Sequence, residues 1–249
     1  MYIDRSKIDS RAKKNKLRII LLIMVLLCAV TFIIIFKTDL LSVQGIEIYG
    51  NENLTKEEIM PSVESTMGFN IFKVKLDSIA SSVLANPYIK TVSVKRKLPN
   101  KLIVRISERK EAAVVPFMGT FLIIDEEGVV LKSALQTPGL KSINGLEFSN
   151  FMEGSVLHVS DQEQLEKALS LAKAMKYIDE DIKEINVTNK KNMVIRFSKG
   201  LSCKIGEGEN LDYKLQLLKG ILADLDSKGI TRGVIDISHE GNPSYSPVE

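Results

Sequence analysis

Few residues in this 249-residue chain have the types and spacing that a chemical site requires. The two histidines, His158 and His239, stand about 80 positions apart, and neither has a set of Cys, Asp or Glu residues around it at metal-ligand spacing. A zinc or catalytic centre needs several convergent side chains. We therefore expect both histidines to lie on the surface or in loops, and we predict no metal site.

Acidic pairs and one glycine-rich segment offer little more. Glu57-Glu58, Glu126-Glu127 and Asp179–Asp181 lie where helix starts or turns are expected, and adjacent residues on a helix do not converge. Gly206-Glu-Gly208 lacks the lysine of a phosphate-binding loop, and its glutamate would repel phosphate. There is no G-x-S-x-G nucleophile elbow. The sequence favours a protein that is not an enzyme and uses no cofactor. It leaves open a glycosidase-type pair of carboxylates that the fold could bring together across a cleft.

The apolar run Ile19–Phe36 determines how the rest of the chain is placed. Its 18 residues carry no charge, which is typical of a helix that crosses a membrane. Residues 1–18 hold seven basic and two acidic side chains, and positive charge beside a span stays in the cytoplasm. We expect a cytoplasmic N-terminus and exported residues 37–249. A cleaved signal peptide is the alternative, but its apolar region is normally shorter and ends at small residues.

The charge gives no sign of nucleic-acid binding, and the two cysteines give no disulfide framework. The net charge of +3 reflects the basic N-terminal tail, so it does not indicate nucleic-acid binding. Cys28 lies inside the span and Cys203 outside the membrane, so no disulfide forms within the chain. Because Cys203 alternates with Leu201 and Ile205, we expect a buried, inert thiol.

The segment after the span carries mixed helix and strand signals. A strand is expected over 40–49, and Thr55–Glu58 has the pattern of a capping box that opens a short helix. A second helix is expected over 76–84, because Asn86-Pro87 ends it. Strands should follow at 91–96 and 102–107, with these side chains buried: Val92, Val94, Leu102, Val104 and Ile106. This order predicts two helices on one face of a three-stranded sheet.

This arrangement resembles the POTRA domain of the FtsQ/DivIB family of bacterial division proteins. The similarity lies in a single span followed by Gly50-Asn51, Asn86–Ile89 and a hairpin ending at Ile106–Arg109. It continues beyond this domain. Phe121–Ile124 and Val129–Leu131 flank a turn at Asp125–Gly128, which resembles the hairpin that opens the second domain of the family.

The remaining elements indicate a β-rich second domain. Ser160–Glu163 is interpreted as a capping box before a helix, and another helix is expected over Leu211–Leu225. Strands are expected at 182–187, 193–198, 201–205 and 233–238. Residues 239–249 are interpreted as a polar tail.

The last strand is the candidate binding element. A C-terminal strand often lies at a sheet edge and can accept a partner strand, although Ile235 and Ile237 could simply fill the core while Pro243 and Pro247 shield the edge. In proteins of the FtsQ/DivIB type, this strand and a nearby helix bind the bitopic coiled-coil proteins FtsB/DivIC and FtsL, so the resemblance favours binding. The matching residues are Gly233, Val234, Ile235, Asp236, Ile237, Ser238, Pro243, Ser244 and Tyr245.

A basic cluster in the first domain has two interpretations. Its outward side chains could form an ordinary solvated face, or they could contact anionic lipid or wall polymer near the membrane. The residues concerned are Lys95, Arg96, Lys97, Lys101 and Arg105.

Together these observations predict an α+β protein with a single-pass type II anchor, a POTRA domain (βααββ) and a β-rich α+β domain. The expected parts are a basic tail (1–18), a transmembrane helix (19–36), a link (37–40), a POTRA domain (41–109), the second domain (110–238) and a polar tail (239–249). The resemblance implies a divisome scaffold in the cell membrane at the septum, linked through its partners to peptidoglycan synthesis. The alternatives are a POTRA-bearing secretion or assembly chaperone and an extracytoplasmic wall-active or wall-binding module.

Overall fold

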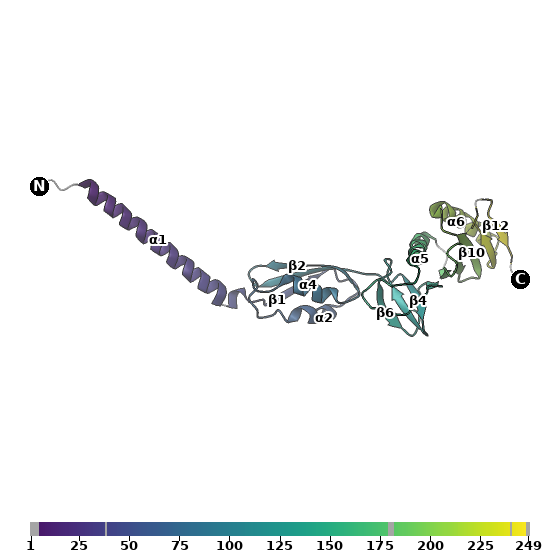
Figure 1. Ribbon diagram of the computed structural model, residues 1–249, viewed down its shortest axis with the longest axis horizontal. Coiled ribbons are helices and arrows are strands. Elements are labelled where there is room, and N and C mark those ends of the chain that lie inside the picture. Colours follow the sequence, from purple (N-terminus) through teal and green to yellow (C-terminus); the bar gives the residue numbers. More distant parts are fainter. Residues whose placement is uncertain (1–4, 38, 179–181, 240, 248–249) are drawn as a thin grey trace. The chain divides into compact units, whose positions relative to one another are not determined.

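The computed structural model describes residues 5–37, 39–178, 182–239 and 241–247. It divides into two compact units, residues 1–84 with 91–107 and residues 85–90 with 108–249. The first unit begins with α1, Arg5–Lys37 (Figure 1). Within the described chain, residues 15–33 form one helical stretch long and apolar enough to cross a membrane, and their side chains are exposed. Helix α1 therefore suggests a membrane anchor.

The rest of the first unit has the predicted strand–helix–helix–strand–strand order, with the first helix divided into two short pieces, α2 and α3, that meet at Met60. The capping box is confirmed, because the Thr55 side chain accepts from the Glu58 N–H and the Glu58 carboxylate accepts from the Thr55 N–H. Pro61 occupies the first turn of its own short helix, where a missing N–H costs nothing. The elements are η1 (Asp39–Leu41), β1 (Gly45–Tyr49), α2 (Lys56–Ile59), α3 (Pro61–Glu64), α4 (Leu76–Leu84), β2 (Ile89–Lys97) and β3 (Lys101–Glu108).

Strand β3 is the centre of this small sheet, whose order is β1-β3-β2 with β1 parallel to β3. Leu102, Val104 and Ile106 are buried as expected. Val92 and Val94 are only half-buried, so the expectation of full burial is wrong for them. The reason is their position, since β2 is an edge strand with one neighbour.

The second unit is built on a nine-stranded mixed sheet of order β12-β11-β10-β9-β8-β7-β4-β5-β6. The sequence did not predict β4, β7 or β12 as strands. The elements are β4 (Ala113–Phe117), β5 (Thr120–Ile124), β6 (Val130–Ala134), β7 (Ser142–Asn144), α5 (Gln162–Ala174), η2 (Met175–Tyr177), β8 (Ile182–Asn186), β9 (Met193–Phe197), β10 (Leu201–Gly206), α6 (Leu211–Ser227), β11 (Gly233–Asp236) and β12 (Ser244–Ser246).

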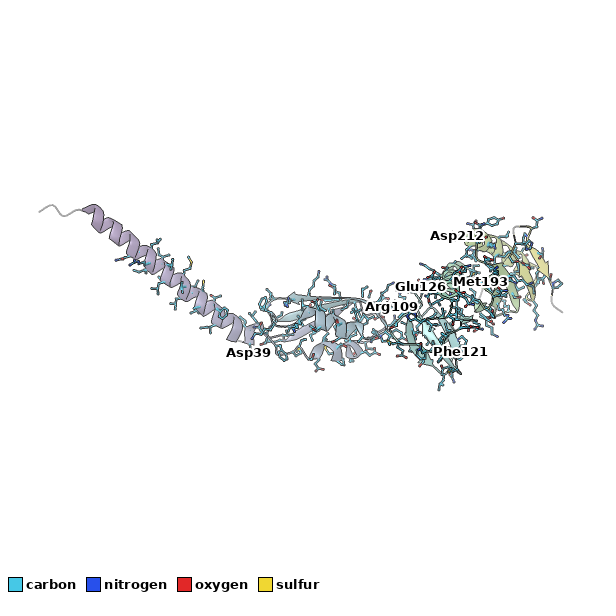
Figure 2. All side chains as sticks on the ribbon, in the orientation of Figure 1. Asp39, Arg109, Phe121, Glu126, Met193 and Asp212 are labelled. Carbon is cyan, nitrogen blue, oxygen red and sulfur yellow. The ribbon has the colours of Figure 1, made fainter. Side chains whose placement is uncertain are left out.

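Helices α5 and α6 cover one face of this sheet and enclose its main core (Figures 1 and 2). Leu165 and Leu171 of α5 and Leu218 of α6 are fully buried against strand residues such as Ile195 and Ile235. The predicted cap of α5 is shifted by one residue. Asp161, rather than Ser160, accepts from the Gln164 N–H, because the helix begins at Gln162.

A buried ion pair holds the β5–β6 hairpin. Asp125 is 3% exposed, and its carboxylate lies 2.5 Å from the Arg109 guanidinium while accepting from the N–H groups of Glu127 and Val129. Arg109 also pairs with Glu127 at 2.8 Å. The turn predicted from Asp125–Gly128 is therefore present, with Gly128 in the left-handed region at φ +79°.

Candidate partner-binding edge

Strand β11, which the sequence indicated as the edge, has neighbours on both sides. It pairs in parallel with β10, as in Cys203↔Ile235, and antiparallel with β12, as in Ile235↔Tyr245. Ile235 and Ile237 are 0% and 3% exposed and fill the core. The prediction that Gly233–Ser238 offers the free edge is therefore wrong, because the segment interpreted as a polar tail folds back as β12 and pairs with it.

The outermost strand on this side is Ser244–Ser246, which includes two of the predicted binding residues, Ser244 and Tyr245. Among the residues that the structure describes, β12 pairs with β11 alone. Its other side is the position at which an added strand would bind. Pro243 and Pro247 flank the strand and limit it to three residues.

Tyr245 fixes β12 to the sheet. Its hydroxyl donates a 2.6 Å hydrogen bond to the Arg232 carbonyl, and its ring packs against the main core. The ring lies directly over Gly233, where a Cβ atom would stand 2.4 Å from Cε2 of Tyr245. Gly233 also has φ +144°, a conformation that other residues rarely adopt. Gly233 and Tyr245 thus form one interlocked contact, and partner contact by Gly233 stays a prediction.

The opposite edge of the sheet is covered. At the start of β6, the Val130 N–H donates to the Ser155 carbonyl at 3.0 Å, and the Gly154 N–H donates to the Val130 carbonyl at 2.8 Å. Further along, the Ser133 N–H donates to the Glu153 carboxylate at 3.2 Å. Segment 153–155 therefore takes hydrogen-bonding groups that an added strand would need, which leaves β12 as the more accessible edge.

A polar row crosses β10, β11 and β12 on the face opposite the main core. Lys204, Asp236 and Ser244 are register neighbours on β10, β11 and β12, and the Lys204 ammonium lies 3.6 Å from the Asp236 carboxylate. The same carboxylate accepts from the Ser238 hydroxyl at 2.6 Å and lies 3.6 Å from His239. Burial raises the pKa of Asp236, but the hydrogen bonds from Ser238 outweigh it, so the pKa lies below its ordinary value. Asp236 thus presents a negative charge beside the edge.

The predicted anionic-contact residues of the first unit are mostly held by that unit. Lys97 and Lys101 lie 2.9 and 3.0 Å from Glu47, and their hydrogen bonds lower the Glu47 pKa to about 2. The Arg96 guanidinium donates to the carbonyls of Ile71 and Val74, and Arg105 lies over the Tyr49 ring at 5.9 Å. Lys95 is exposed. Contact of this face with an anionic surface stays a prediction.

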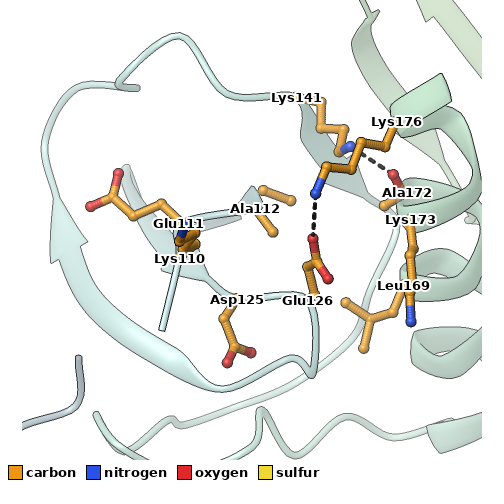
Figure 3. Close-up of a pocket in the computed structure, with 11 residues that line it drawn as sticks. Lys110, Glu111, Ala112, Asp125, Glu126, Lys141, Leu169, Ala172, Lys173 and Lys176 are labelled. Atoms are coloured by element: carbon orange, nitrogen blue, oxygen red, sulfur yellow. Dashed lines mark hydrogen bonds and ion pairs between the residues drawn. The ribbon is translucent and has the colours of Figure 1, made fainter. Parts of the chain in front are cut away.

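A cavity of about 250 Å³ in the second unit lies between β4, the β5–β6 turn and α5 (Figure 3). Lys141 donates to the Ala172 carbonyl at 2.7 Å, and burial lowers its pKa. Lys176 pairs with Glu126 at 3.4 Å. Lys141 is held by the last turn of α5 and Lys176 by the Glu126 carboxylate. These contacts do not place a nucleophilic side chain beside a general base in the cavity.

The remaining candidate residues, among those that the structure describes, do not form a metal site. Within the described ranges, no group of three His, Cys, Asp or Glu side chains could hold a metal ion. The predicted burial of Cys203 is confirmed, and burial raises the pKa of its thiol to about 12. Asp179–Asp181 lies outside the described residues.

Sequence reasoning missed the strand character of Ser244–Ser246. These residues show no apolar alternation and stand between two prolines, so periodicity gave no signal. One available signal was Tyr245, a large side chain of high strand propensity in an otherwise small and polar segment.

Comparisons with known proteins extend over most of the chain. The family "POTRA domain, FtsQ-type" matches residues 41–109, and the family "Cell division protein FtsQ/DivIB, C-terminal" matches residues 113–238. Cell division protein DivIB of Clostridium botulinum strain Hall is 28% identical over 242 residues, covering 96% of this chain and 94% of that protein. Cell division protein FtsQ of Myxococcus fulvus is 23% identical over 214 residues, covering 83% of this chain and 72% of that protein. The major extracytoplasmic domain of Geobacillus stearothermophilus DivIB, a solved structure, covers 49% of this chain and 97% of its own, with 16% identity and a TM-score of 0.29.

Proposed function

The chain belongs to the FtsQ/DivIB family of cell division proteins, and from this we propose that it is a non-catalytic divisome scaffold that binds single-pass partners through strand β12. The partners are FtsB/DivIC-like and FtsL-like coiled-coil proteins, through which the scaffold is linked to septal peptidoglycan synthesis. Helix α1 anchors it with the N-terminus in the cytoplasm and both units outside, in agreement with the basic residues that precede the span.

One observation carries this proposal: β12 is an outer strand whose described pairing is with β11 alone, while the opposite edge of the sheet is covered by segment 153–155. An extended partner segment beside β12 would continue the sheet through backbone hydrogen bonds. Side chains near this edge, including Lys204 and Asp236, would then select among partners by charge.

The test is a proline at Ser246, whose backbone N–H faces Val234 of β11, so the substitution loosens the outer strand from the sheet. We expect Ser246→Pro to lose capture of purified FtsB/DivIC-like and FtsL-like segments in a pull-down with the full chain in detergent. Ser246→Ala is the matched control, because it removes the same hydroxyl and keeps the N–H. Circular dichroism must show that both variants keep the wild-type fold. Normal capture by folded Ser246→Pro protein would refute strand addition at β12.

A further inference from the structure

The loops at one end of the first unit carry an unusual concentration of exposed apolar side chains. Large apolar residues scattered singly on a surface are ordinary, whereas a group of them marks an interaction site. We call this group the loop patch. Its members and their exposed fractions are Leu40 (59%), Met67 (42%), Phe69 (62%), Phe72 (49%) and Leu98 (60%).

Backbone hydrogen bonds hold the three segments of the loop patch together. Segments 39–44 and 66–73 are joined by the Val43 N–H on the Phe69 carbonyl at 2.9 Å and by the Ile71 N–H on the Leu41 carbonyl at 2.8 Å. The turn that contains Leu98 is joined by the Gln44 N–H on the Asn100 carbonyl at 2.8 Å. The five side chains therefore project from one end of the unit, the end at which β1 begins.

The chain itself determines what lies near this end. Asp39, labelled in Figure 2, begins the segment that follows α1, and the apolar run ends at Phe36. Leu40 follows Phe36 by four positions, and a chain extends at most about 3.5 Å per residue. Leu40 therefore lies within about 14 Å of the end of the apolar run, whatever the orientation of the unit. The headgroup region on each side of a bilayer is about 5–8 Å deep, so even a fully extended link keeps Leu40 within about two headgroup depths of the end of the apolar run.

The charges around the loop patch fit an anionic lipid surface. Lys73 and Lys75 are exposed beside Phe72, and among the described residues neither forms an ion pair. Asp39 and Asp77 are nearby in sequence, so the balance is mixed and the apolar side chains must supply most of the affinity. Basic residues beside exposed Phe and Leu side chains are the combination found on surfaces that lie in the membrane interface.

We propose that the loop patch inserts into the headgroup region of the same membrane that holds α1, and so fixes the first unit against the bilayer. This inference rests on the membrane anchor proposed above. It assigns membrane contact to apolar loop side chains rather than to the basic residues of β2 and β3, which Glu47 and backbone carbonyls already engage.

The natural sequence contains no tryptophan, so a single tryptophan introduced at a chosen position is the only source of tryptophan fluorescence. We would reconstitute three single-tryptophan variants of the full chain into phosphatidylcholine–phosphatidylglycerol vesicles with brominated acyl chains, which quench tryptophan at short range. Phe72→Trp reports on the loop patch. Tyr49→Trp is the matched control, because Tyr49 is 48% exposed but lies at the other end of β1, about 13 Å from Gly45 at about 3.3 Å per residue. Leu26→Trp reports on the span.

We expect strong loss of emission for Leu26→Trp, a smaller loss with a blue shift for Phe72→Trp, and none for Tyr49→Trp. The inference would be overturned if Phe72→Trp behaved like Tyr49→Trp, with unquenched emission at long wavelength, while Leu26→Trp was quenched. That result would leave the membrane anchor standing. An unquenched Leu26→Trp would overturn the anchor and this inference with it. A Phe69→Trp variant guards against a defect peculiar to position 72, and it should behave as Phe72→Trp does.

Discussion

Replacement of Gly233 by alanine tests whether the contact between Gly233 and Tyr245 holds the edge strand in place. The added Cβ atom would stand 2.4, 2.7 and 2.8 Å from three atoms of the Tyr245 side chain, closer than real contacts allow. The tyrosine must therefore move outward, because it is the side chain that can give way. Its 2.6 Å hydrogen bond to the Arg232 carbonyl is lost as it moves.

Two contributions determine how far Gly233→Ala lowers the free energy of unfolding. A residue with a side chain at φ +144° stores about 1–3 kcal/mol of backbone strain. Loss of the tyrosine hydrogen bond costs about 0.5–1.5 kcal/mol. We expect Gly233→Ala to lower the free energy of unfolding by about 2–4 kcal/mol. We also expect faster amide exchange at Ser244–Ser246 and loss of partner capture.

A second glycine provides the matched control. Gly220 lies in α6 and is exposed, and a Cβ atom added there would meet nothing within 4 Å beyond its chain neighbours and the backbone of its own helix. Gly220→Ala should therefore raise stability by about 1 kcal/mol, because alanine is the better helix former. Urea denaturation followed by circular dichroism measures both changes, and hydrogen exchange locates them. A Gly233→Ala protein as stable as wild type, with β12 still protected, would refute the interlock.

Two further predictions concern ionisation. Glu47 has a folded-state pKa of about 2 against an ordinary 4.5, so its ion pairs stabilise the protein above pH 4.5 and that contribution is lost as pH falls through about 2. In an acid titration of stability, the advantage of wild type over Glu47→Gln should shrink between those values, and a constant difference would contradict the assignment. Cys203, whose pKa is raised to about 12, should not react with a thiol reagent at about pH 8 in a Cys28→Ser background until urea unfolds the protein. Rapid reaction in the folded protein would show that the thiol is accessible.

Local patterns predicted much of this fold. The capping box at Thr55 depends on residues three positions apart, and the alternation of Leu102, Val104 and Ile106 depends on one strand with one buried face. Both signals are complete within a few residues, so the sequence alone was sufficient. The cap at Asp161 was misplaced by one position because Ser160 and Asp161 are both good N-caps. Only the start of the packed helix decides between them.

The candidate site depended on contacts between distant residues and was harder to predict. Glu47 meets Lys97 and Lys101 across about 50 positions, so two lysines of an apparently free basic face are held in ion pairs within the unit. In the same way, β12 owes its position to the contact of Tyr245 with Gly233 and Arg232, which no periodicity within Ser244–Ser246 reveals. The sequence assigned the edge to β11, whereas β12 is the outer strand.

The shortness of β12 limits what strand addition can supply. Three residues offer only a few backbone hydrogen bonds, each worth about 1 kcal/mol net, whereas micromolar binding requires about 8 kcal/mol. Flanking prolines and a short edge also protect the sheet from indiscriminate pairing. A specific partner must therefore gain additional contacts beyond the backbone of β12. The adjoining row of Lys204, Asp236 and Ser244 lies next to that edge on the face opposite the main core, and it is where such contacts would select one partner over another.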